Sequence, residues 1–385
     1  MEKLTEDVLS NIFIRLPAKQ LVQMRCVCKP WSAFLSESYF IKSHLNHSNK
    51  DNEIVLLFDV AFDYGILSYQ AFPCAAHDLS KSPVIQLNDH VKLPFNFPQS
   101  ALNKYGGHVI GSVNGLICFY IGRYYDVKGI YIWNPSLSVI MCLTDVHTGG
   151  YRELGFGFGF DPKTDDYKVV KLPDDNHESG RWREPVEVYS MKKGSWEFIV
   201  DKFPKGVHRY PKDVSKCYID NHDGHIHWLC YYFNNKVVRI IKTIVAYNLG
   251  GESFRHISLP DSIAYNDQYR WHNVLSMLGG KLCVVSCARG DDGKFEVWVM
   301  NEYGVADSWV KSHVLSKLNL EAGTCRRPFG FTLNNKFLFY DRSRGLLGWY
   351  DQDIDKVTHF RSDTADPTRV VQYVDSLVWY AAPTT

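Results

Sequence analysis

A β-rich pattern that repeats about every fifty residues constrains the fold of this chain more than any other feature. Each copy has a hydrophobic strand with an aromatic residue near its end, then a turn and a second strand. The aromatic markers are Trp133, Tyr189, Tyr247, Trp298 and Tyr350, which lie 56, 58, 51 and 52 residues apart. A tight turn leading into an alternating strand also recurs, as in NGLICF, DGHIHW and, more weakly, VDSLVW. Such all-β repeats are typical of propeller blades.

The number of blades depends on the strands outside these five copies. A blade cannot bury both of its faces alone, so blades stack around an axis. The copies cover residues 107–361, and strand-like segments remain at both chain ends. We expect EIVLLF and ILSYQAF to combine with RVVQYVDSLVWYA into a sixth blade, which closes the ring and removes exposed edges. The predicted fold class is mostly β, with six blades; seven blades and a pair of β-sandwiches are the alternatives.

The first 45 residues differ in character and predict three short helices. An apolar stripe at helical spacing is formed by Leu9, Ile12, Phe13 and Leu16. Pro17 ends this helix, and Pro30 suits the first turn of the third. So small a unit makes a poor core by itself. Two explanations remain open: the helices complete their core against another protein, or they pack on the rest of the chain.

Composition excludes several classes of function. The 43 basic and 42 acidic residues leave a net charge of +1, so no global field draws the chain to nucleic acid or to a membrane. No apolar run reaches the roughly 18 residues of a membrane span. The opening MEKLTEDVL lacks the pattern of a secretion signal. We therefore expect the ten cysteines to be reduced, and the protein to be cytoplasmic, nuclear or both.

Few motifs in the sequence indicate catalysis or ligand binding. We expect no catalytic residue, no metal and no cofactor. GFGFGFD at residues 155–161 lacks the helix that a phosphate-binding loop requires, and it predicts a strand whose small face lies near the crowded axis. His225 and His227 share one side of a predicted strand, but no further ligands complete a metal site. The basic run at 201–216 predicts a solvated loop or part of a rim for an acidic partner.

The helical segment resembles the F-box, by which substrate receptors dock on the Skp adaptor of SCF-type ubiquitin ligases. The resemblance rests on Asp7-Val8-Leu9, Ile12, Arg15-Leu16-Pro17, Leu21, Arg25, Val27-Cys28-Lys29 and Trp31. It departs at Leu4-Thr5, where the family often has Leu-Pro. The resemblance implies that the adaptor is bound through Leu9, Ile12, Leu16, Pro17, Val27 and Trp31, and that cullin and a RING protein follow through the adaptor.

The remaining chain resembles the plant F-box-associated, kelch-related domain. The motifs are GSVNGLICFY with YIWNPS, GFGFDPKTDDYKVVKL with VEVYSMKKGSWEFI, and VWVMNEYGVADSWVK. The domains are then an F-box at 1–45, a polar linker at 46–52 and a propeller at 53–381. Layout and length also resemble the S-locus F-box proteins of pollen self-incompatibility, which implies a secreted style ribonuclease as the target.

These resemblances predict a non-catalytic substrate receptor that brings a target to a ubiquitin-loaded enzyme. The alternatives are a propeller enzyme, either a glycosidase or a kelch-type oxidoreductase, and an F-box scaffold that delivers nothing for degradation. Target contacts are predicted in the loops at 174–184, 201–216 and 265–272, which mix the residue types that anchor interfaces. The predicted anchors are Trp182, Arg209, Tyr269 and Trp271.

Overall fold

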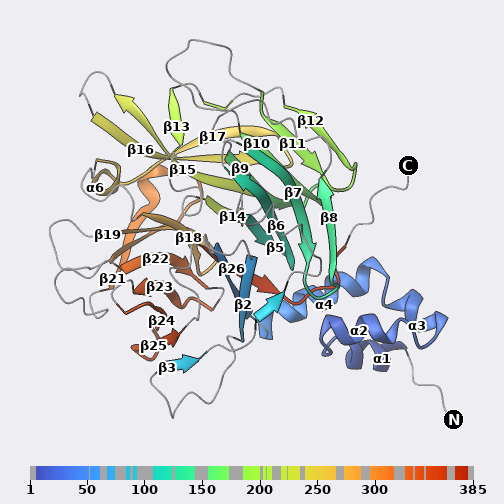
Figure 1. Cartoon of the computed structure of the whole chain (residues 1–385). Coiled ribbons are helices and arrows are strands. Elements are labelled where there is room, and N and C mark those ends of the chain that lie inside the picture. The colour runs from blue at the N-terminus through green and yellow to red at the C-terminus, as the bar shows by residue number, and fades with distance from the viewer. Residues whose placement is uncertain are drawn as a thin grey trace.

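The computed structural model of the chain places helices at its start and strands throughout the rest (Figure 1). It describes residues 6–51, 53–60, 67–73, 84–86, 90–92, 107–123, 126–143, 155–172, 185–199, 203–204, 206–209, 218–222, 224–234, 239–265, 273–287, 295–315, 326–332, 334–341, 344–361 and 369–379. In these ranges, no helix has the length and apolar character that crossing a membrane requires.

The helices lie mainly in the first fifty residues. They are α1 (Glu6–Phe13), α2 (Ala18–Met24), α3 (Lys29–Phe34), α4 (Ser38–Asp51) and α6 (Asp261–Ala264), with a 3-10 turn at Ala306–Ser308. The early strands are β1 (Glu53–Val60), β2 (Leu67–Pro73), β3 (Val84–Gln86), β4 (His90–Lys92), β5 (Gly107–Val113), β6 (Leu116–Arg123), β7 (Asp126–Asn134) and β8 (Val139–Leu143).

The middle strands are β9 (Gly155–Asp161), β10 (Asp166–Leu172), β11 (Glu187–Ser190), β12 (Ser195–Phe198), β13 (Val207–Arg209), β14 (Tyr218–His222), β15 (His225–Asn234), β16 (Arg239–Asn248) and β17 (Ser253–Ser258). The last strands are β18 (Val274–Leu278), β19 (Lys281–Cys287), β20 (Phe295–Met300), β21 (Trp309–Leu315), β22 (Arg326–Phe331), β23 (Phe337–Asp341), β24 (Leu346–Asp351), β25 (Lys356–Arg361) and β26 (Arg369–Val374).

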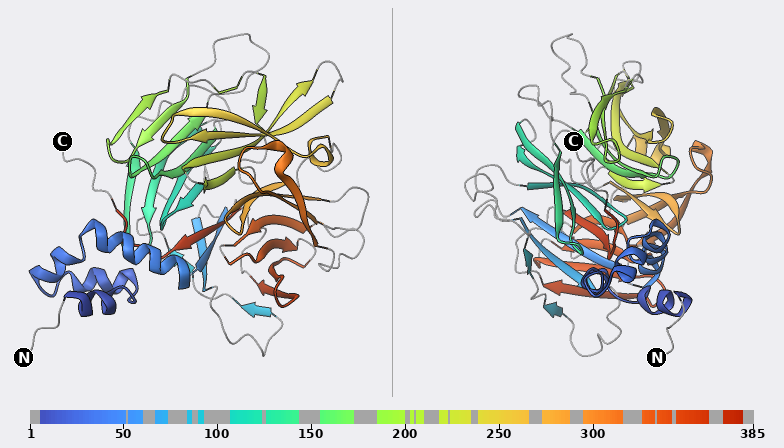
Figure 2. Two further views of the ribbon diagram at one scale, coloured as in Figure 1. Left: turned by 180° about the vertical axis from the view of Figure 1, so that it is seen from behind. Right: turned by 90° about the vertical axis from the view of Figure 1, so that its right-hand side faces the viewer.

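Five antiparallel sheets each come from one continuous stretch of chain and form five blades of a β-propeller. Their main strands are β5–β8, β9–β12, β13–β17, β18–β21 and β22–β25. The sequence markers Trp133, Tyr189, Tyr247, Trp298 and Tyr350 each lie in the third strand of the four that make up the sequence repeat. Figures 1 and 2 show the sheets arranged in a ring, with α1–α4 gathered outside it.

A further four-stranded sheet joins the two ends of the chain in the order β26-β1-β2-β4. β1 pairs antiparallel with β26, with Ile54 opposite Tyr373 and Leu56 opposite Val371. β26 lies against β5 on one side, and Gln372 Nε2 donates to Phe331 O of β22 at 2.7 Å on the other. The chain ends therefore pair as the sequence predicts, and no seventh sheet occurs among the described strands.

The segment of alternating glycine and phenylalanine forms a strand, β9, as predicted, and its small face meets the neighbouring blade. A Cβ on Gly157 would lie 2.7 Å from Trp228, and one on Gly159 would lie 2.8 Å from Leu249. The alternate residue Phe158 is fully buried in the other direction, in the cluster with Tyr167. The glycines thus permit close packing of the β9–β12 and β13–β17 sheets.

A buried ion pair within the β9–β12 sheet also shares its lysine with the β13–β17 sheet. Lys168 Nζ donates to Asp161 Oδ2 at 2.9 Å and to Leu249 O at 2.8 Å. Burial alone would raise the pKa of Asp161, but hydrogen bonds from Thr164 and Lys168, with the Lys168 charge, hold it below its ordinary value. The carboxylate therefore stays ionised and anchors the turn after β9.

The helices and the ring are continuous, because α4 runs through the segment predicted as a linker. Residues 46–51 are helical, and β1 begins at Glu53. Ser48 in this stretch is buried. Leu45 belongs to the cluster that contains Val374 and Val378 of the C-terminal segment. The segment predicted as a polar linker at 46–52 is therefore helical as far as Asp51.

The segment that follows β26 ties the helices to the ring. Asp375 Oδ2 accepts from Ala18 N at the start of α2 at 2.6 Å, and Leu377 is buried in the helical core. Asn134 Nδ2 donates to the carbonyls of Ser376 and Val378 at 3.0 and 2.8 Å. The motif VDSLVW was predicted to turn into a strand, but residues 375–379 instead leave the sheet to make these contacts.

Two positions beside this segment show how closely it approaches the ring. Asn114 and Gly115 both have positive φ, as the turn between β5 and β6 requires. A Cβ on Gly115 would lie 2.3 Å from Ser376 Cβ, so only glycine fits. The hydroxyl of Ser136 contacts both Tyr373 and Asp375.

Deletion of residues 370–385 is expected to unfold the whole ring and not merely shorten it. The deletion removes the partner of β1, the cap of α2 and the buried Leu377. Circular dichroism should show loss of the cooperative thermal transition. A truncated protein with an unchanged melting temperature would contradict the closing role of β26.

Asp161→Asn should lower stability at pH 7 by about 3 kcal/mol, because it leaves Lys168 buried without a counter-charge. Since the folded pKa of Asp161 is below its unfolded value of about 3.9, the pair stabilises above that pH. The contribution is lost as pH falls through the folded pKa, so the gap between wild type and variant should shrink in acid. Urea unfolding between pH 7 and 3 measures this.

The matched control is Glu197→Gln, which breaks an exposed Lys193–Glu197 pair at 2.8 Å. It should leave the unfolding midpoint unchanged across the same pH range. A gap for Asp161→Asn that stays constant down to pH 3 would show that the Asp161 charge does not stabilise the fold.

Candidate adaptor-binding and target-binding surfaces

The first four helices build a small core of their own around Phe13, Leu21, Leu35 and Phe40. Leu9, Leu16 and Trp31 are half-buried against it, and the Trp31 ring meets Phe13 edge-on at 5.0 Å between centroids. Arg25 Nη2 donates to Leu35 O at 2.6 Å, and His44 Nε2 contacts Leu16 O at 2.9 Å. These contacts fix the helices relative to each other.

A second set of apolar side chains on the same helices remains exposed. Val8, Ile12 and Val27 are 43%, 47% and 64% exposed, and Pro17 is also exposed. The structure shows the second explanation offered by the sequence, because one side of the helices packs on the ring through Leu377 and Leu137. Whether the exposed apolar residues bind another protein stays a prediction.

The six residues predicted to bind an adaptor thus divide into two groups. Ile12, Pro17 and Val27 lie on the exposed surface, whereas Leu9, Leu16 and Trp31 mainly support the core. Val8 is an exposed apolar residue of α1 that the predicted site did not include. The sequence could have indicated its exposure, because Val8 does not fall on the helix face that carries Leu9 and Phe13.

Among the described residues, the helices contact the ring at one end, which we call the helix end. Three turns lie at this end. The β5–β6 turn lies against Ser376, and Leu137 of the β7–β8 turn packs on the helical core. Asp165 of the β9–β10 turn forms an ion pair with Lys42 of α4 at 3.0 Å. In an antiparallel sheet, successive connections alternate between ends. The connections after the second and fourth strands therefore lie at the opposite end, which we call the loop end.

The strands that precede the three loops predicted to bind a target, β10, β12 and β17, finish at the loop end, with Leu172, Phe198 and Ser258 as their last residues. Of the predicted anchors, Trp182, Tyr269 and Trp271 lie outside the described residues. Only the backbone of Arg209 is described, in β13, where it pairs with Cys230 of β15. The run at 201–216 is not wholly a solvated loop, because it contains β13 and the buried Phe203 and Val207.

A cavity of about 510 Å³ lies at the loop end of the β13–β17 sheet, between two of these loops. Val207 and Tyr265 line it where the described parts of the two loops meet the sheet. Buried Ile241 and Leu259 supply apolar surface, and Lys242 is also buried there. Polar groups come from Thr243, His256, Ser258 and Asp261. Partial burial lowers the pKa of His256, so its imidazole is neutral at pH 7.

His225 and His227 are placed by β15 as predicted, with ring centroids 6.3 Å apart. The two nitrogens are engaged within the protein: His227 Nε2 contacts Tyr303 OH at 2.8 Å, and His225 Nε2 contacts Asn248 Nδ2 at 3.0 Å. Across the described ranges, no three His, Cys, Asp or Glu side chains are grouped so as to hold a metal ion. These histidines join the β13–β17 sheet to the turn after β20.

The fold and surfaces define a β-propeller with a small helical unit at one end. Comparison with known families agrees with this class. An F-box associated beta propeller domain matches residues 72–341, and an F-box domain matches residues 1–43. The first match covers more than half of the chain, so the chain belongs to the family of F-box proteins with an F-box-associated β-propeller.

Relatives and solved structures were also compared. The chain is 27% identical to an F-box/kelch-repeat protein of Arabidopsis thaliana, covering 79% of this chain and 77% of that protein. It is 27% identical to the F-box protein CPR1 of the same plant, covering 94% and 85%. A GH93 α-L-arabinofuranosidase of Fusarium graminearum is similar over 67% of this chain and 81% of its own, with 10% identity and a TM-score of 0.44.

Proposed function

We propose that the chain is the substrate-recognition subunit of an SCF-type ubiquitin ligase, non-catalytic in itself. The observation that carries the proposal is the exposed apolar set on an F-box that is already packed on its propeller. The helices would bind the Skp adaptor, and through it cullin and a RING protein. The target would be ubiquitylated because it is held near a loaded enzyme, which raises the effective concentration of its lysines.

In this proposal, each end of the ring binds a different partner. The adaptor would occupy the helix end through Val8, Ile12, Pro17 and Val27. The target would bind at the loop end, where the loops at 174–184, 201–216 and 265–272 leave the strands and where the 510 Å³ cavity lies. A target bound there would not compete with the adaptor for the same surface.

The architecture proposed for this role has two units in one body. The helical unit runs through α4, and the propeller begins at β1. We count the sheet β26-β1-β2-β4 as the closing sixth blade, since it contacts both β5 and β22. A ring of this kind exposes only its outer strand edges and its end loops, and the loops are free to vary with the target.

The proposal also covers the target, the pathway and the compartment. A secreted style ribonuclease in pollen self-incompatibility is the target that the resemblance to S-locus F-box proteins supports. A reduced, cytoplasmic or nuclear protein is consistent with the absence of a disulfide at Cys26, Cys28, Cys118, Cys142, Cys230 and Cys283, which are free thiols.

Replacing Ile12 and Val27 together with Glu should weaken adaptor binding by more than about 100-fold, because two charges would be buried against apolar adaptor surface. Both side chains are about half exposed or more, so folding should survive. Isothermal titration with a recombinant plant Skp adaptor gives the affinity. Phe198→Glu is the control, since Phe198 is 65% exposed on the distant strand β12. Equal affinity of both variants would contradict the proposed adaptor surface.

Replacing Trp182, Arg209, Tyr269 and Trp271 together with Ala should abolish target capture while adaptor affinity stays unchanged. The reason is that the strands before these residues, β10, β12 and β17, finish at the loop end, away from the helices. The measurement is affinity purification from source tissue with the proteasome blocked, comparing proteins enriched by wild type and by the variant. An identical enriched set would show that recognition lies elsewhere on the ring.

A further inference from the structure

The β13–β17 sheet differs from the other four repeat sheets in its first strand. β13 and β14 both pair with β15, with Arg209 opposite Cys230 and Tyr218 opposite Trp228. Because Cys230 and Trp228 are only two residues apart on β15, residues 210–217 are an insertion within a single interrupted strand. The first strands of the other repeat sheets, β5, β9, β18 and β22, have no such interruption. The insertion is therefore specific to this sheet among the five.

The chain that follows β12, β15 and β17 is basic, although the whole protein has a net charge of only +1. These three strands finish at the loop end, and the segments after them are residues 199–217, 235–239 and 259–273. Together the segments contain eight basic and four acidic residues: Lys202, Lys205, Arg209, Lys212, Lys216, Lys236, Arg239 and Arg270, against Asp201, Asp213, Asp261 and Asp267. By contrast, residues 173–186, which follow β10 of the neighbouring sheet, contain two basic and four acidic residues. The excess of positive charge thus distinguishes this sheet from its neighbour.

The cavity of about 510 Å³ at the loop end of the same sheet has a largely apolar inner lining. Val207, Ile241 and Leu259 are all buried there, and the half-buried rings of Tyr232 and Tyr265 add aromatic surface. A large apolar side chain of a partner would gain from this lining, because it would be removed from water.

The lining of the cavity does not itself favour one sign of charge, since it has one basic and one acidic residue, Lys242 and Asp261. The charge preference comes from the basic segment 199–217, which supplies Gly206 and Val207 to the lining. A partner that is complementary to both features would be acidic, with an apolar side chain among its carboxylates.

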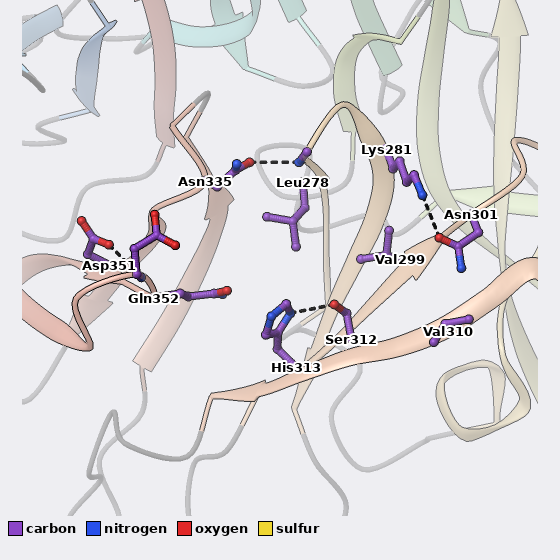
Figure 3. Close-up of a pocket in the computed structure, with 12 residues that line it drawn as sticks. Leu278, Lys281, Val299, Asn301, Val310, Ser312, His313, Asn335, Asp351 and Gln352 are labelled. Carbon is purple, nitrogen blue, oxygen red and sulfur yellow. Dashed lines mark hydrogen bonds between the residues drawn. The ribbon is translucent and has the colours of Figure 1, made fainter.

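A second cleft, of about 440 Å³, lies beside β21 between the β18–β21 and β22–β25 sheets (Figure 3). The turns that bound it join β18 to β19, β22 to β23 and β24 to β25, so it belongs to the helix end. Lys281 Nζ donates to Asn301 Oδ1, and Gly279 N donates to Asn335 Oδ1, both at 2.9 Å. Because the proposed function assigns the helix end to the adaptor, this cleft is not part of the surface considered for the target.

We propose that the β13–β17 sheet binds an acidic segment of the target protein, with one phenylalanine or similar side chain of that segment in the 510 Å³ cavity. This inference rests on the proposed receptor function, because that function places the target at the loop end. The basic segments would speed the encounter with an acidic target and disfavour a basic one. The buried apolar lining would then hold the aromatic ring, which presents a large contact area.

A nucleic acid would be attracted by the same positive charges. Its charged backbone would gain nothing from the buried aliphatic side chains of Val207, Ile241 and Leu259, whereas a side chain of a protein would. The apolar lining therefore favours an acidic protein segment over a nucleic acid.

The probe for this site is a fluorescein-labelled, end-capped peptide with the sequence GDEEFEEDG, titrated with the full-length protein by fluorescence anisotropy. We expect saturable binding that weakens at least about tenfold when sodium chloride rises from about 50 to about 300 mM, because salt screens exposed charges. The peptide GDEESEEDG should bind at least about tenfold more weakly, because it lacks the apolar side chain. The charge-reversed peptide GKRRFRRKG should show no saturable binding.

The variant Lys212→Glu with Lys216→Glu reverses two charges of the insertion and should weaken binding of GDEEFEEDG at least about tenfold. The matched control, Lys192→Glu with Lys193→Glu, makes the same change in net charge at exposed residues of the β11–β12 turn, at the helix end. It should bind the peptide within about twofold of wild type. Melting curves check that each variant folds.

A variant that fills the cavity separates the apolar contact from the charge. Ser258 is exposed and lines the cavity, so the side chain introduced by Ser258→Trp would occupy it. In this variant the phenylalanine and serine peptides should bind equally, while the weakening by salt should remain.

Four results would overturn the proposal: no saturable binding of GDEEFEEDG to wild type, equal binding of the phenylalanine and serine peptides to wild type, equal effects of the two double lysine variants, or binding of a single-stranded oligothymidylate as tight as that of the peptide. The last result would point to nucleic acid. Titration with the Skp adaptor measures the receptor function separately. A protein that binds the adaptor but not the peptide keeps that function and contradicts only this inference.

Discussion

The pairing of the last strand with the first is the interaction on which the rest of the structure depends. β26 supplies the partner of β1, and it lies between β5 and β22, so the ring is continuous through it. The residues that follow immediately cap α2 through Asp375 and fill the helical core through Leu377. One short segment therefore pairs the two ends of the chain and fixes the helices on the propeller.

Much of this fold could be predicted from sequence because its signals are local. The aromatic markers and tight turns fall within single hairpins, so their spacing predicted five sheets. The strands outside these five repeats lie at the two chain ends, and pairing them with each other removes exposed edges. The unpredicted parts depend on contacts distant in sequence. The residues at 46–51 look like a linker by composition, yet α4 continues through them because its apolar side has the ring to pack on. Nothing local to VDSLVW indicates that Asp375 would cap a helix more than 350 residues earlier, with Ala18 as its partner.

The candidate sites divide in the same way. The exposed residues Ile12 and Val27 were predicted from a local pattern, but that pattern could not separate them from Leu9, which supports the core. The loop-end cavity and the cleft beside β21 are formed by several separate stretches of chain, so no spacing in the sequence marks them. His225 and His227 were found on one side of a strand as expected, although their contacts with Asn248 and Tyr303 depend on residues that only the fold brings near.

A rigid support between helices and ring matters for the proposed receptor, because it would fix the distance between the adaptor and a bound target. The most direct test is amide hydrogen exchange of the full chain, comparing wild type with Leu377→Ala. We expect amides in α2 and in β26 both to exchange at least about tenfold faster in the variant, since a large buried side chain shared by both units is lost. Unchanged exchange in α2, with faster exchange confined to residues 369–379, would show that the helices fold independently of the C-terminal segment and would contradict a shared support.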